Sequence, residues 1–96
     1  MYKMNFEWDE NKREINLDKH GLDFFDVTDV WLDPNNFDIY DENHSSSNEE
    51  RWIKFGKIES GKIVCVVYTE IEKGLYRIIS SFSDKKIERI YYEQND

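Results

Sequence analysis

The fold is decided by residues 75–93, LYRIISSFSDKKIERIYYE, where the hydrophobic period of the chain changes. Residues 75–81 alternate between two faces, which is typical of a β-strand. Ile87, Ile90 and Tyr91 then follow the spacing i, i+3, i+4, the apolar stripe of a helix that lies on a sheet. The segment therefore predicts a last strand followed by a closing helix.

The same segment carries four cations, which are Arg77, Lys85, Lys86 and Arg89. Either Ser83 or Asp84 can cap the closing helix by accepting a hydrogen bond from an unpaired backbone N–H. Free N–H groups and the dipole at a helix start favour an anion, so a phosphate would suit this corner. Ordinary solvated charges are the alternative from the residues alone.

A hairpin is predicted directly before this segment. Residues 51–58 and 63–70 flank the turn Glu59-Ser60-Gly61-Lys62. The second strand begins IVCVVY and is apolar on both faces, which predicts a central strand that is covered on both sides. Cys65 within it is expected to be a buried, inert thiol.

The chain begins with a predicted strand and helix. Asn5 to Trp8 form the short strand, and Asp9 is a suitable N-cap for a helix that runs from Glu10 to about His20. Gly21 ends that helix because glycine enters the left-handed region without a Cβ clash. Lys19 and His20 then lie in the last turn, where positive charge complements the dipole.

A second helix is expected to open at Asp23 and to bury a face made of Phe24, Val27, Thr28 and Trp31. Asp33-Pro34 ends it, because the residue before proline is pushed out of the helical region. The FDIY segment, residues 37–40, predicts an edge strand.

The polar loop after that strand holds candidate acid–base groups. It reads HSSSNEE over residues 44–50. The candidates are His44, Glu49 and Glu50: a histidine can exchange a proton near neutral pH, and a carboxylate beside an arginine can be held ionised. A solvated loop with incidental charge is the alternative.

These elements predict a single α+β domain over residues 1–96, with a short N-terminal strand, two helices, an antiparallel sheet of three to four strands and a C-terminal helix. The polar, acidic start does not resemble a signal peptide, and no apolar run approaches the roughly 20 residues that a bilayer requires. We therefore expect a cytoplasmic protein with no membrane segment. His20 and His44 lack the close ligand pairs of a zinc site, so no metal is expected.

Charge divides the chain in two. Residues 1–50 hold four Lys/Arg and fourteen Asp/Glu, a balance of −10, whereas residues 51–96 hold nine and seven, a balance of +2. The acidic half suits a basic protein partner, and the other half can present a local cationic site despite the net charge of −8.

Five ordered motifs resemble the BrnT family of bacterial toxins: FEWDENK, NLDKHGLDF, HSSSNEERW, the hairpin ending VVYTE, and RIIS followed by KKIERIYYE. The resemblance runs from Phe6 to Glu93. It implies a RelE-like fold and a toxin of a type II toxin–antitoxin system that cuts RNA without a metal or other cofactor. It also implies neutralisation by a BrnA-like antitoxin with a ribbon-helix-helix DNA-binding domain, in a heterotetramer that contacts DNA only through the antitoxin.

Metal-free RNA cleavage needs a base for the 2′-hydroxyl proton, cations at the phosphorus and an acid for the leaving oxygen. On the matching motifs, Arg77 could bind the scissile phosphate, and Lys85, Lys86 and Arg89 could bind RNA phosphates. His44 or Glu50 is the candidate acid or base, with Arg51 as a second phosphate ligand or as the partner that orients Glu50.

One position departs from the family pattern. Phe82 stands where the resemblance leads us to expect an arginine after RIIS. Losing one such donor commonly costs ~10²–10³ in rate. The phenyl ring could stack on an RNA base or cover the core. A catalytically weakened protein that only binds the antitoxin and acts as a co-repressor is therefore the alternative to an active ribonuclease.

Overall fold

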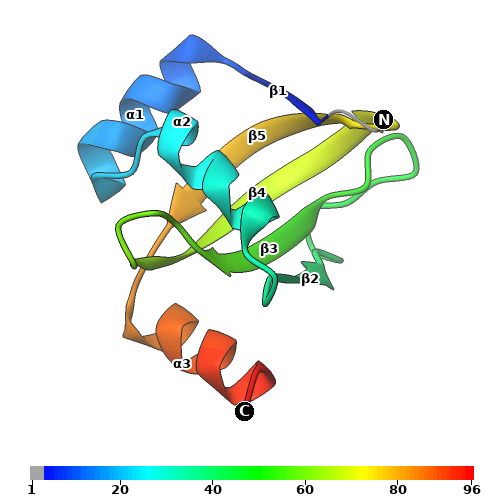
Figure 1. The fold of residues 1–96 in the computed structure, drawn as a ribbon. Helices are drawn as coiled ribbons and strands as arrows, with labels where there is room; N and C mark the ends of the chain where they lie inside the picture. Colours follow the sequence, from blue (N-terminus) through cyan, green and yellow to red (C-terminus); the bar gives the residue numbers. More distant parts are fainter. Residues whose placement is uncertain (1–3) are drawn as a thin grey trace.

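Residues 4–96 are described by a computed structural model, in which a single sheet carries helices on both faces (Figure 1). In chain order the elements are β1 (Asn5–Trp8), α1 (Glu10–His20), α2 (Phe24–Val27), the 3₁₀ helix η1 (Thr28–Leu32), β2 (Phe37–Tyr40), β3 (Trp52–Lys57), β4 (Ile63–Glu72), β5 (Leu75–Phe82) and α3 (Lys85–Gln94). Among these residues, no helix is long and apolar enough to cross a membrane.

The five strands lie in the order β1-β5-β4-β3-β2. The apolar β4 is central, as its sequence predicts, and the β2–β3, β3–β4 and β4–β5 pairs are antiparallel. The opening strand joins this antiparallel sheet as a fifth strand, because β1 pairs in parallel with the first half of β5. The predicted α+β class is confirmed. The first strand, β1, and the last strand, β5, lie side by side in the sheet.

Short-range signals set the helix ends where the sequence predicts them. The Asp9 side chain accepts a hydrogen bond from the Lys12 N–H, and Gly21 ends α1 at a φ of 68°. At α3 the cap is Asp84, which accepts from the Ile87 N–H over 2.8 Å. The Ser83 hydroxyl instead donates to the Ile63 carbonyl over 2.6 Å, tying the corner to β4.

The prediction of one continuous second α-helix is wrong. Only one α-turn forms before the chain tightens into η1. The buried residues are accordingly Phe24, Val27 and Val30, spaced by three as a 3₁₀ helix requires, whereas Thr28 and Trp31 are only partly buried.

Two hydrophobic cores lie on opposite faces of the sheet. Under α2 and η1, the first core contains Phe24, Val27, Val30, Val64 and Val66, among others. Gly56 of β3 passes directly beneath η1, where an added Cβ would lie 2.8 Å from the Val30 Cβ. This contact leaves no room for a side chain.

The second core lies under α3 and contains Phe55, Ile63, Cys65, Ile87 and Tyr91. Burial raises the pKa of the Cys65 thiol to about 12, so the residue is buried and inert, as predicted. The Tyr91 hydroxyl donates to Asp33 over 2.6 Å, so α3 is also bound to the end of η1.

Candidate functional site

A row of polar side chains crosses the sheet at the end that α3 leaves uncovered. Pairing sets Glu7 opposite Arg77, and Arg77 opposite Thr69. Arg51 directly precedes Trp52, the first residue of β3, which pairs with Tyr68, so Arg51 lies opposite Thr69. The Arg51 carbonyl accepts a hydrogen bond from the Asp41 N–H over 2.9 Å. Because opposed residues share a face of a sheet, we call Glu7, Arg77, Thr69, Arg51 and Asp41 the cross-sheet row.

Arg77 is held within this row by Glu7. Its Nε and its terminal nitrogen donate to Glu7 Oε2 over 3.2 and 3.0 Å. Both side chains are almost half exposed, at 46% and 42%. The guanidinium is therefore oriented from the neighbouring strand while remaining open to solvent.

Arg51 is oriented from its own loop. Its Nε donates to Glu49 over 2.8 Å, and its backbone N–H donates to the Ser45 hydroxyl over 2.9 Å. The carboxylate that takes the guanidinium is therefore Glu49 and not the expected Glu50. Glu50 is attached to the row through its backbone, because its carbonyl accepts from the Thr69 hydroxyl over 2.8 Å.

His44 reaches the row through Asp41. The Asp41 carboxylate lies 3.0 Å from His44 Nδ1, and the imidazole is 67% exposed. A carboxylate on one ring nitrogen fixes the ring and leaves Nε2 for proton exchange. The structure thus places His44, Arg51 and Arg77 along the cross-sheet row and attaches Glu50 to it through the backbone carbonyl.

The cations of the closing helix form a separate group. Arg77 lies five residues before Phe82, the end of β5, which is about 16 Å of strand. Lys85, Lys86 and Arg89 are exposed on α3, and Arg89 lies 4.0 Å from Glu93. The strand–helix corner therefore does not gather all four cations in one cluster.

Phe82 sits at that corner as a partly buried residue. Its ring packs against the α3 core, and its centroid lies 6.0 Å from that of His20. The structure therefore gives Phe82 a packing role at the position where an arginine is expected from the sequence.

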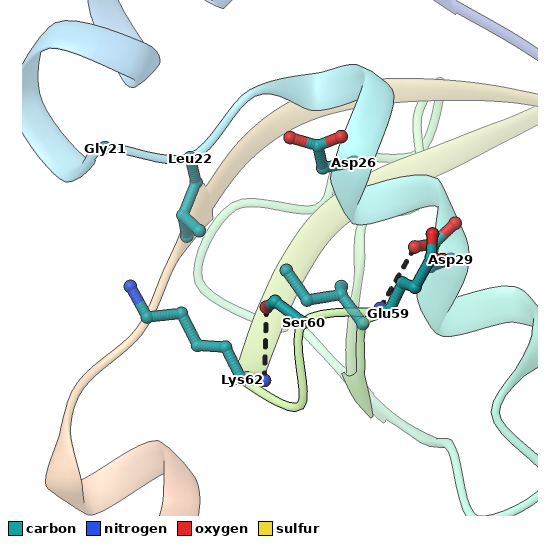
Figure 2. A pocket seen from close by; sticks show the side chains of 8 residues that line it. Gly21, Leu22, Asp26, Asp29, Glu59, Ser60 and Lys62 are labelled. Atoms are coloured by element: carbon teal, nitrogen blue, oxygen red, sulfur yellow. Dashed lines mark hydrogen bonds between the residues drawn. The ribbon is translucent and has the colours of Figure 1, made fainter.

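The largest pocket described lies on the other side of the sheet, between α2–η1 and the β3–β4 turn (Figure 2). Its lining includes Asp26, Asp29 and Glu59, with Lys62 as the one cation among the lining residues. Asp29 accepts from the Glu59 N–H over 3.1 Å. Three carboxylates would repel a phosphate, so this pocket does not suit the phosphate that Arg77 and Arg51 are expected to bind. Among residues 4–96, no group of three or more His, Cys, Asp or Glu side chains could hold a metal ion.

Sequence reasoning missed three members of the row, namely Glu7, Thr69 and Asp41. Glu7 lies between Phe6 and Trp8, which pack on the first core. Alternation alone therefore indicates that Glu7 faces the other way. Its pairing with a residue 70 positions later depends on tertiary structure.

Comparison with known proteins gives two findings. Residues 8–88 match the profile of a family described as ribonuclease toxin, BrnT, of type II toxin–antitoxin system. The fold is similar to the 1.1 Å crystal structure of the Brucella abortus ribonuclease toxin BrnT, with a TM-score of 0.67 and 25% identity. That similarity covers 86% of this chain and 99% of the Brucella chain. The search of curated proteins gave no significant match.

Proposed function

Since the chain belongs to the BrnT family of ribonuclease toxins of type II toxin–antitoxin systems, we propose that it is a metal-independent endoribonuclease whose reaction centre is the cross-sheet row. The observation that carries this proposal is the presence of two oriented, accessible arginines and an Asp-bound histidine along one row of an open sheet face. Two guanidinium groups can bind one phosphate through several hydrogen bonds each.

The proposed reaction uses the 2′-hydroxyl of RNA as its nucleophile. One of His44 and Glu50 removes the proton of this hydroxyl, and the other, in its protonated form, gives a proton to the departing 5′-oxygen. Arg77 and Arg51 stabilise the charge that develops on the phosphorus. An exposed ion pair such as Arg77–Glu7 contributes less than about 1 kcal/mol, so an RNA phosphate can replace Glu7 on the guanidinium. Lys85, Lys86 and Arg89 bind phosphates further along the RNA.

The family implies an antitoxin partner. We propose that this partner is a BrnA-like protein with a ribbon-helix-helix domain, which forms a heterotetramer with the toxin in the cytoplasm and carries its DNA contacts. The acidic first half of the chain, at −10, complements such a basic partner.

A second function is favoured by two observations, one at the cross-sheet row and one at the strand–helix corner. Both arginines already have a carboxylate bound, and Phe82 packs into the core at the position of an expected arginine. In this alternative the protein has lost efficient cleavage and acts only as antitoxin ligand and co-repressor.

Expression of the chain alone in a bacterial host separates the two functions. The active toxin is expected to stop growth and to fragment bulk RNA, and Arg77→Ala and Arg51→Ala should both relieve this. Lys62→Ala, which removes a cation on the other side of the sheet, is the matched control. Intact RNA and normal growth with folded wild-type protein would select the alternative.

A further inference from the structure

The side of α1 that meets β5 is unusual for a helix packed on a sheet. At the spacing i, i+3, i+4, i+7, i+8 it presents Lys12, Ile15, Asn16, Lys19 and His20. Asn16 alone among them is buried, and Ile15 is 64% exposed. A stripe that normally carries the apolar contact therefore carries three groups that can bear positive charge.

Asn16 explains how such a stripe can face the sheet. β1 pairs only with residues 75–78, so the edge of β5 beyond them has no strand partner. Asn16 Oδ1 takes that role by accepting from the Ser81 N–H over 3.0 Å, and its amide donates to the Leu22 carbonyl over 3.1 Å. The first of these buried hydrogen bonds fixes α1 to the strand edge, and the second fixes the Asn16 side chain to the segment that follows α1.

A pocket of about 240 Å³ remains between the helix and the strand, lined by Lys12, Lys19 and His20 from α1 and by Ile79 and Ser80 from β5, with Ile15 and Asn16. No carboxylate lines it. At about 100° per residue, Glu14 and Asp18 fall on the far side of α1. Among residues 4–96, neither Lys12 nor Lys19 forms a side-chain ion pair.

The pocket lies between the two groups of cations described above. Ile79 is two residues after Arg77 along β5, and the His20 ring lies against Phe82, three residues before α3 begins at Lys85. Arg77, the α1 cations and the start of α3 therefore follow one another along β5. Several successive phosphates of one RNA strand can span this length.

We propose that this pocket binds the single-stranded RNA next to the cleavage position. Lys12 and Lys19 each contact a backbone phosphate, and the His20–Phe82 ring pair offers a surface on which an adjacent base stacks. The inference rests on the proposed RNA substrate, and it assigns a binding role to residues that the cleavage chemistry does not use.

The test measures binding, not cleavage. Wild type, Lys12→Ala/Lys19→Ala and the control Lys57→Ala/Lys62→Ala are titrated into a fluorescent single-stranded RNA whose 2′-hydroxyls are methylated, so that it cannot be cut. All four lysines are exposed, which leaves the fold intact, and melting curves check this. The pocket variant should bind at least about tenfold more weakly and lower the salt slope by roughly 1.4, since each phosphate contact on a single strand contributes about 0.7. The control variant should bind within about twofold of wild type.

Equal losses in the two double variants, or unchanged binding in the pocket variant, would overturn the inference. So would a pocket variant that binds RNA normally but loses antitoxin. Cleavage of unmodified RNA is measured separately. If wild type binds through Lys12 and Lys19 but does not cut, the pocket stands and the ribonuclease proposal fails. If wild type cuts RNA and the pocket variant cuts it with the same kcat/KM, the ribonuclease proposal stands and the pocket proposal fails.

Discussion

The two faces of the sheet differ in what covers them. On one face, α2 and η1 seal a continuous core in which Phe24, Val27 and Val30 are fully buried. On the other, α3 covers only the end near the β3–β4 turn (Figure 1). Beyond α3, Ile39 and Arg77 are exposed. The comparison indicates that stability is concentrated on the sealed face, which leaves the open face free to carry polar groups that add little to stability.

The largest effect on stability is expected for Phe24→Ala. Removing a fully buried ring from the sealed core should destabilise the protein by about 3–5 kcal/mol, measured by urea unfolding. Leu32→Ala, whose side chain is 73% exposed, is the control and should change stability by less than about 0.5 kcal/mol. RNA cleavage per folded molecule should not change, and a large loss there would show that the faces are not separable.

Arg77→Ala tests the open face. Loss of one oriented guanidinium should lower kcat/KM for RNA by ~10²–10³, about 2.7–4 kcal/mol in the barrier, whereas stability should fall by less than about 1 kcal/mol because the Glu7 pair is exposed. Arg77→Lys should recover part of the rate, since an ammonium keeps the charge without the fork. Full activity in Arg77→Ala would place the reaction elsewhere.

Gly56→Ala returns to the sealed face with a smaller effect. The new methyl would lie 2.8 Å from the Val30 Cβ and 3.2 Å from its Cα, so η1 has to move. Such overpacking costs about 1–3 kcal/mol and should appear as a lower Tm with unchanged RNA binding. A Tm equal to wild type would mean that η1 yields freely, in conflict with a sealed core.

Asp33 joins the two faces, and its effect should be the smallest. Burial disfavours its charged form, but hydrogen bonds from the Tyr91 hydroxyl and from the Asn35 and Lys57 N–H groups outweigh this and lower the pKa. Because the folded pKa lies below the ordinary 3.8, the stabilisation is present above about pH 4 and is lost as pH falls through the folded value.

Asp33→Asn should therefore lower stability by about 1 kcal/mol at pH 7 and flatten the fall in stability below pH 4. Tyr91→Phe removes one of the three donors and is the matched variant. Denaturant titrations at pH 3, 5 and 7 would contradict the assignment if Asp33→Asn kept the pH dependence of wild type.

Local signals determined most of what the sequence could predict. The caps at Asp9 and Gly21, the turn at Gly61 and the change of period after Ser83 act over a few residues, so the corresponding elements lie where expected. The prediction of a single second α-helix was wrong because the spacing of Val27 and Val30 fits both an α-helix, with about 3.6 residues per turn, and a 3₁₀ helix, with about 3.0. Packing of η1 on β3 then selects the tighter form.

The candidate site was predictable by residue type but not by geometry. Arg51, Arg77 and His44 can be selected because their chemistry suits a phosphate and a proton. Their partners Glu49, Glu7 and Asp41 depend on a loop conformation and on strand register, which depend on the folded structure. For the same reason the sequence suggested that Arg77 and the α3 cations meet at one corner, when a half-strand separates them.

The parallel contact between β1 and β5 has a consequence for synthesis. The ribosome makes β1 long before it makes β5, the strand with which β1 pairs. Glu7 precedes Arg77, the guanidinium that it orients, by 70 residues. Nascent chains that stop short of β5 lack Arg77 and the strand that carries it, and closure of so long a loop is intrinsically slow. On the proposed function, a growing polypeptide of this kind therefore gains its RNA-cleaving centre only after β5 has been made.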